Sequence, residues 1–212
     1  MAMVLTLLTL AFAMFAGWYS GQRTDYFPAS LQTASAVCVS DLGDINEQQV
    51  LDEFEDVWLS DELSAFGEPS LYRRPSSAPP SIRLTWIRSF HDPIVVRVDT
   101  TADGRSIMTA RRRPGGLGFR PSEGIDRNQS IVRQLSAAEA TALQKAIDDV
   151  GLFNAPASGC RCCVDGSLWL IEAADPQHGY RFRSRQSPKG GLERGLGLHL
   201  LALTGWDPGR IY

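Results

Sequence analysis

The cysteines of this chain are its most distinctive chemistry-bearing residues. Cys160, Cys162 and Cys163 lie in one short segment, and Cys38 is far upstream. Cys160 and Cys163 have the C-x-x-C spacing that is typical of redox-active thiols or of half a metal site. A thioredoxin-like motif would lie between a strand and a helix, whereas this segment follows a helical pattern and precedes a strand pattern. All four cysteines are therefore candidate disulfide or redox residues.

A zinc site at this segment has little support. Structural zinc needs four ligands, usually as two close pairs. Outside the cluster, the candidate zinc ligands are Cys38, His178 and His199, and the sequence has no second C-x-x-C or paired-histidine motif. We therefore predict no metal site. In an oxidising compartment up to two disulfides are expected, for example from Cys38 to one cysteine of the cluster, and the pairing stays open.

His91 and Asp92 are the residues that most resemble half of an acid–base pair. Such chemistry needs side chains that converge on one proton, and neighbours in a turn usually diverge. Pro93 follows them, which fits a plain turn. No nucleophile is identifiable, so no catalytic residue is predicted. An enzyme would require His91, Asp165 and Cys163 to converge in one pocket.

No cofactor is predicted either. The glycine-rich segment 115–118 lacks the lysine and the flanking strand and helix of a phosphate-binding loop.

Arginines form two local groups that are candidate anion-binding residues. One group is consecutive and the other alternates along a predicted strand, with Tyr180 and Phe182 between its members. The groups are Arg111, Arg112 and Arg113, and Arg181, Arg183 and Arg185. Guanidinium groups bind phosphate and carboxylate well, but the net charge of −3 gives no general attraction to nucleic acid. We expect no nucleic-acid partner, and a solvated strand face is the simpler interpretation.

The N-terminal segment is hydrophobic and carries no charge before Arg23. Its length is near the lower limit for spanning a bilayer, and Trp18 and Tyr19 lie where interfacial aromatic residues occur. Ala11-Phe12-Ala13 also fits the small-x-small rule for signal cleavage. Residues 1–22 are therefore expected to be a signal or a membrane anchor. We expect a membrane-anchored or exported protein of the bacterial periplasm, in which these residues contact the membrane.

Hydrophobic periodicity places the remaining elements. Residues 50–58 have helical spacing, and Asp44 followed by Glu47 indicates the start of this acidic helix. Alternation predicts strands, and three- to four-residue spacing predicts helices. The expected strands are 82–90, 94–99, 106–112, 131–135, 167–172 and 180–185, and the expected later helices are 136–150 and 192–203.

These elements define an α+β fold. We expect a mainly antiparallel sheet of about five or six strands, with two C-terminal-half helices packed on one face and the acidic helix at the edge. An N-terminal hydrophobic helix precedes it. The expected organisation is a hydrophobic signal or membrane anchor in 1–22, a linker in 23–43 and a single α+β domain in 44–212. Hydrophobic residues make up 43% and charged residues 21%, which is ordinary for a globular protein.

Several short motifs resemble those of a group of uncharacterised bacterial proteins. The motifs are Glu68-Pro69-Ser70-Leu71, Arg88-Ser89-Phe90-His91-Asp92-Pro93, Leu135-Ser136 with Glu139, Asp165-Gly166-Ser167-Leu168-Trp169, and Ser187-Pro188. The resemblance covers about the last two-thirds of the chain and implies that these positions form one unit. It brings no assigned activity, and the cysteine cluster lies outside it.

The leading hypothesis is a non-catalytic, envelope-associated domain that binds a protein or an envelope component. One alternative is a small envelope hydrolase or thiol-redox enzyme. Another is an arginine-rich binder of anionic ligands, which requires both arginine groups on one face. The oligomeric state is not predicted.

Overall fold

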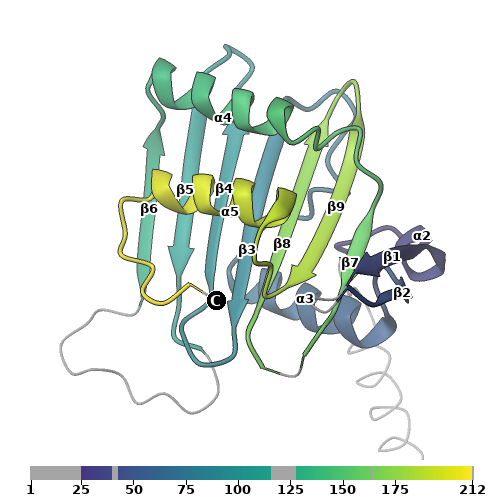
Figure 1. Cartoon of the computed structure of the whole chain (residues 1–212). Helices are drawn as coiled ribbons and strands as arrows, with labels where there is room; N and C mark the ends of the chain where they lie inside the picture. Colours follow the sequence, from purple (N-terminus) through teal and green to yellow (C-terminus); the bar gives the residue numbers. More distant parts are fainter. Residues whose placement is uncertain (1–24, 40–42, 116–127, 164, 212) are drawn as a thin grey trace, which may run out of the picture.

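A seven-stranded sheet forms the centre of the protein in the computed structural model, which describes residues 25–39, 43–115, 128–163 and 165–211 (Figure 1). The strand order is β6-β5-β4-β3-β8-β9-β7. Neighbouring strands are antiparallel except β7, which pairs with β9 in parallel. The strands are β3 (Ser81–Arg88), β4 (Ile94–Thr100), β5 (Ser106–Arg112), β6 (Gln129–Gln134), β7 (Ser158–Cys160), β8 (Ser167–Asp175) and β9 (Gly179–Gln186). The expected α+β class and the mainly antiparallel sheet are confirmed, with one strand more than the expected maximum.

Two helices of the C-terminal half, α4 (Ala137–Asp149) and α5 (Gly191–Leu203), cover one face of this sheet (Figure 1). Alternation along β3 directs Leu84 and Trp86 to this face, where they pack with α5 residues such as Leu200. The capping box that opens α4 is confirmed: the Ser136 hydroxyl accepts from the Glu139 N–H, and the Glu139 carboxylate accepts from the Ser136 N–H.

The acidic helix α3 (Glu53–Ala65) packs against the opposite face of the sheet rather than at its edge (Figure 1). Leu59 and Leu63 of α3 join Leu170 and Phe182 of the sheet in a second core. The helix begins after Asp52, whose side chain accepts from the Glu55 N–H. The expected start at Asp44 is therefore wrong, because Ile45–Gln49 forms strand β2 instead.

The N-terminal part of the described chain belongs to the packed structure. Residues 23–43 were expected to be a linker, but their described part contains α2 (Ser30–Thr33) and β1 (Ser35–Val39). Tyr26, Phe27 and Leu31 are buried in the second core, which explains why this segment packs onto the domain. Strand β1 pairs with β2 in a separate antiparallel hairpin.

The hydrophobic segment expected to be an N-terminal helix lies outside the described residues, as do residues 116–118 of the glycine-rich loop. Within the ranges that the structure describes, no helix has the length and apolar character needed to cross a membrane.

Candidate functional site

One disulfide joins the N-terminal hairpin to the main sheet. Cys38 of β1 is bonded to Cys160 at the end of β7, across a sequence separation of 122 residues. Cys38 is 3% exposed. Beside the bond, the chain of β7 contacts the backbone of Val50 so closely that a Cβ on Gly159 would meet the Val50 carbonyl oxygen at 1.7 Å. Glycine is therefore required at this position.

Cys162 and Cys163 are exposed and lie outside the disulfide. Their backbone N–H groups both donate to Gln186 Oε1, each at 3.1 Å. The Cys162 thiol also lies 3.5 Å from the Gln186 carbonyl oxygen. Among the described residues there is no cluster of three or more Cys, His, Asp or Glu side chains suited to hold a metal ion.

The three residues that an enzyme would have to bring together differ in their exposure. Cys163 and Asp165 are exposed, and His91 is half-buried. Neither of the two hollows described below, both built from described residues, is lined by any of these three side chains. Burial and the nearby Arg88 lower the pKa of His91, so its neutral form is favoured at neutral pH.

The two arginine groups do not form one surface. Strands β5 and β9 are separated by three strands, which places them roughly 19 Å apart at about 4.8 Å per strand. Arg111 and Arg113 face α3, where they pair with Glu68 and Glu62. Arg183 faces α5 and pairs with Glu193.

The other three arginines of these groups donate to backbone carbonyls. Arg112 donates to Asp207, Arg181 to Phe153 and Arg185 to Val39. All six guanidinium groups thus have intramolecular acceptors, and the geometry disfavours an anion site that combines both groups.

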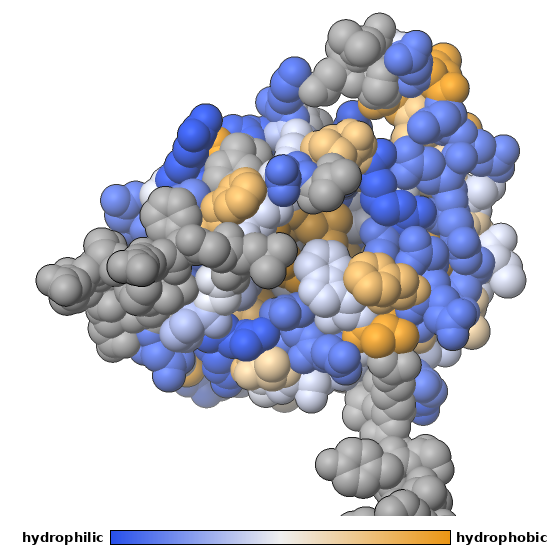
Figure 2. Space-filling view, turned by 90° about the horizontal axis from the view of Figure 1, so that it is seen from below, coloured by the Kyte–Doolittle hydropathy of each residue, from blue (hydrophilic) through white to orange (hydrophobic). Residues whose placement is uncertain are grey.

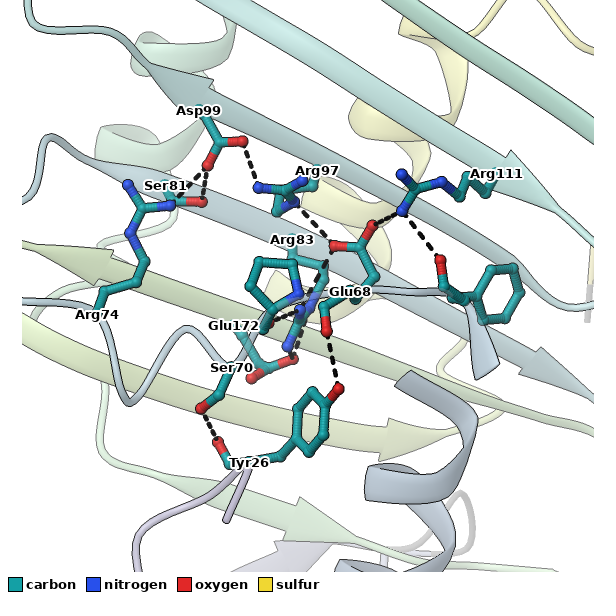
Figure 3. A network of polar contacts seen from close by, with 12 residues as sticks. Tyr26, Glu68, Ser70, Arg74, Ser81, Arg83, Arg97, Asp99, Arg111 and Glu172 are labelled. Carbon is teal, nitrogen blue, oxygen red and sulfur yellow. Dashed lines mark hydrogen bonds and ion pairs between the residues drawn. The ribbon is translucent and has the colours of Figure 1, made fainter. Parts of the chain in front are cut away.

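A network of buried charges lies between the sheet and the segment that follows α3 (Figure 3). Arg83, Glu172 and Glu68 have side chains that are 0% exposed. Arg83 Nε and Nη2 donate to Glu172 Oε2 at 2.9 and 2.6 Å, and Nη1 donates to the Pro69 carbonyl at 2.7 Å. Burial alone would lower the pKa of Arg83, but Glu172 and Glu68 together outweigh it and the pKa is raised.

Glu68 anchors its segment through two further arginines. Its carboxylate accepts from Arg97 at 2.8 Å and from Arg111 at 2.7 Å, and its backbone carbonyl accepts from the Tyr26 hydroxyl at 2.8 Å. Because each carboxylate oxygen of Glu68 has a donor, the network fixes the chain after α3 against the sheet. We assign it a structural role.

Tyr180 completes this network on the Glu172 side. Its hydroxyl donates to Glu172 Oε1 at 2.8 Å. Burial, together with the adjacent carboxylate, raises the pKa of Tyr180 well above its usual value. Tyr180 therefore stays protonated and acts as a donor.

The hollow that best fits a ligand lies between α4 and the ends of β3, β4 and β8, and we call it the α4 cavity. Its volume is about 440 Å³, which is within the range of small-molecule sites. It is lined by Pro80, Ser81, Ile82, Val98, Thr100, Ser106, Ala140, Leu143, Gln144, Ile147, Asp148, Gly151, Leu152, Phe153, Asn154, Asp175, Gln177 and His178. Aliphatic residues thus share the cavity with carboxylates, amides and an aromatic pair.

The polar lining of the α4 cavity is acidic or neutral. Asp148 and Asp175 contribute carboxylates, and the lining residues that the structure describes include no Lys or Arg. Although partial burial opposes ionisation of Asp175, N–H groups from Gln177 and His178 and the His178 ring lower its pKa. The His178 ring lies 2.7 Å from Asp175 Oδ1 and stacks on Phe153 with ring centres 4.7 Å apart.

Asp175 and His178 have the arrangement of a base and its orienting carboxylate, but the turn itself explains their contact. Asp175 Oδ1 also accepts from the backbone N–H groups of Gln177 and His178, as expected of an Asx turn. Of the hydroxyls at the cavity, Ser81 donates to Asp99 at 2.7 Å. The turn therefore accounts for the contact between Asp175 and His178.

A second hollow, of about 520 Å³, lies between α2, α3 and Tyr72. It is larger, but its described lining contains no Val, Leu or Ile and includes the Arg73–Asp25 ion pair, whereas the α4 cavity has a substantial aliphatic wall. On the face seen from below in Figure 2, hydrophobic residues occur as separate spots among hydrophilic ones. The α4 cavity is therefore the stronger candidate.

The fold and this cavity define a disulfide-linked α+β domain with an acidic hollow of ligand size. No known family matches the chain, and no characterised protein is significantly similar to it in sequence.

The α4 cavity has no recognisable signal in the sequence. His178 stands out in the sequence only as a possible nitrogen donor for zinc, and the residues of α4 only as one face of a helix. The buried network left a weak signal, because Arg83 and Glu172 occupy central positions of strands whose other residues are largely apolar.

Proposed function

We propose that the protein is a non-catalytic, envelope-associated domain that binds a partner through the α4 cavity. The acidic, partly apolar lining of that cavity is the observation that carries this proposal. Its aliphatic part favours an alkyl chain, and the two carboxylates of its described lining, which has no Lys or Arg, favour a positive charge. A Lys or Arg side chain of a protein partner, or an amine of an envelope component, combines both features.

Envelope association is supported by two independent observations. The uncharged apolar segment 1–22 fits a signal or an anchor. The Cys38–Cys160 disulfide belongs to an oxidising compartment, because cytosolic thiols are kept reduced. Membrane fractionation of a tagged protein, followed by thiol labelling with and without reductant, tests this part. A cytosolic protein in which all four cysteines label without reductant would overturn it.

Binding is tested with three probes of equal length: hexylammonium, hexanol and hexanoate. The measurement is NMR titration of the protein, followed at the amides of Leu143 and Leu152 in the cavity wall. We expect the affinity order amine, alcohol, carboxylate, since the lining is negative. If none of the three probes shifts these amides, the α4 cavity is not a binding site.

Asp148→Asn provides the charge test, and Asp149→Asn is its matched control. Both residues are exposed on α4, but Asp148 lines the cavity whereas Asp149 pairs with Lys145 at 2.7 Å. Loss of one carboxylate should weaken amine binding about 1.5- to fivefold, as for an exposed ion pair. Asp149→Asn should leave it unchanged. Equal effects of the two variants on amine affinity would show that the Asp148 carboxylate does not contribute to binding of a charged ligand in the cavity.

A further inference from the structure

Four sulfur atoms lie in two chain segments that meet where β7 ends. Cys160 belongs to the disulfide with Cys38, and Cys163 follows three residues later as an exposed thiol. We propose that this segment is a thiol–disulfide exchange site, in which Cys163 displaces Cys38 from Cys160. This activity is separate from ligand binding in the α4 cavity.

Cys163 is the better attacking group of the two thiols. The Cys162 thiol is directed to the Gln186 carbonyl oxygen at 3.5 Å, which holds it against β9. A Cys160–Cys163 bond would close the short loop that is typical of C-x-x-C motifs. Such a bond requires the two Cα atoms to lie within about 7 Å of each other, so the segment between them must form a tight turn. Residues 161–163 belong to no helix or strand, so a turn there breaks no ladder of hydrogen bonds.

The exchange step conserves electrons and needs no oxidant. The Cys163 thiol loses its proton to solvent, and its thiolate attacks Cys160 Sγ. The Cys160–Cys163 bond forms as the Cys38–Cys160 bond breaks. Cys38 leaves as a thiolate and takes a proton from solvent, so one thiol and one disulfide are present before and after.

The structure already provides a place for the released Cys38 thiol. Its sulfur lies 3.8 Å from the carbonyl oxygens of Gly159 and Ala36, both of which can accept from an S–H group. The site is buried, so the thiol would be shielded from solvent reagents in the folded protein. After cleavage of the disulfide, the buried Cys38 thiol therefore still has a hydrogen-bond acceptor.

The hairpin also stays in place without the covalent bond. Gln48 Nε2 donates to the Arg161 carbonyl, and the Arg161 N–H donates to Gln48 Oε1, both at 2.9 Å. The Arg161 guanidinium pairs with Glu55 and donates to the Gln49 carbonyl at 2.8 Å. Because these contacts do not involve sulfur, both disulfide states can share one fold.

Disulfide mapping of the full chain tests the exchange. The protein is kept without reductant at mildly alkaline pH, quenched in acidic denaturant, alkylated and digested for mass spectrometry. We expect Cys38 to be alkylated in a fraction that matches the loss of alkylation at Cys163. In Cys163→Ser this fraction should fall at least about tenfold, and in the matched control Cys162→Ser it should stay within about twofold. An unchanged fraction in Cys163→Ser, or its loss in Cys162→Ser, would overturn the assignment.

A second variant removes the competing partner. In Cys38→Ser, oxidation with glutathione disulfide should produce the Cys160–Cys163 bond, detected as one internally linked peptide. Pairing of Cys160 with Cys162, or only with glutathione, would contradict the proposal. Mapping of the wild-type protein stays decisive even if this variant folds poorly.

Discussion

Replacement of Arg83 by Met removes the central cation of the buried network, at a point where the side chains of Arg83, Glu68 and Glu172 are all 0% exposed. In Arg83→Met, the Tyr180 hydroxyl is the side-chain donor that Glu172 keeps among the described residues, and the charge of Glu172 stays buried. Loss of one partner of a buried ion pair costs about 3–5 kcal/mol, because the remaining charge is neither solvated nor paired. We expect this cost in the free energy of unfolding.

The reverse variant, Glu172→Met, should cost less. Arg83 would keep the Pro69 carbonyl at 2.7 Å and Glu68 at 3.5 Å. We therefore expect a loss near the lower end of the same range, about 3 kcal/mol. In the double variant no charge of the pair stays behind, and Glu68 keeps Arg97 and Arg111. The double variant should cost about 2 kcal/mol, well under the sum of the two single losses.

Urea unfolding followed by tryptophan fluorescence measures these values, since Trp86 and Trp169 are both fully buried. Arg105→Met is the control: Arg105 pairs with Asp103, and both side chains are more than half exposed, so the loss should stay below about 1 kcal/mol. Additive costs in the double variant would refute the coupling on which the structural role of the network rests.

Two further outcomes follow from α4 and α5. Hydrogen bonds from Arg133 and then Ser136 lower the pKa of Glu139 from 4.5 to about 2. Because the pKa is lower in the folded state, ionised Glu139 stabilises the fold fully above pH 4.5, and this stabilisation is lost as the pH falls through about 2. We therefore expect the wild-type protein to have a higher urea midpoint than Glu139→Gln above pH 4.5 and the same midpoint near pH 2. A difference in midpoint that does not change with pH would contradict this prediction. On α5, a Cβ on Gly197 would meet the Trp169 ring at 2.4 Å, whereas Gly195 has open space. Gly197→Ala should therefore lower the free energy of unfolding by about 1–3 kcal/mol, whereas Gly195→Ala should raise it by up to about 1 kcal/mol. Equal shifts of the melting temperature in the two variants would show that the Trp169 ring moves to accommodate the methyl group.

The elements that the sequence predicts well are those with a local cause. Alternation in β3, β4 and β5 follows from the two-residue repeat of side chains in a strand. The capping box at Ser136 and Glu139 is a local exchange of hydrogen bonds. These patterns need no knowledge of distant residues, and each appears in the structure close to where it was expected.

Strand β7 had no such signal. It has three residues, one of them glycine, and pairs in parallel with β9, so neither length nor alternation marks it. The position of the acidic helix cannot be predicted from its sequence, because its hydrophobic residues show that one side is buried but do not show which element covers that side. Packing of α3 on the second sheet face required the apolar residues around Tyr26 and Leu31 to fold with it.

The cysteines separate what sequence determines from what tertiary structure decides. The sequence by itself defined four candidate cysteines, a C-x-x-C spacing and an apolar N-terminal segment. Only the tertiary structure determines that Cys160 is the partner of Cys38, because the fold brings β1 next to the end of β7 across a sequence separation of 122 residues. The α4 cavity and the Arg83 network arise in the same way, from residues that are distant in sequence. Local patterns specify secondary structure, whereas pairing and cavities depend on where packing brings separate segments together.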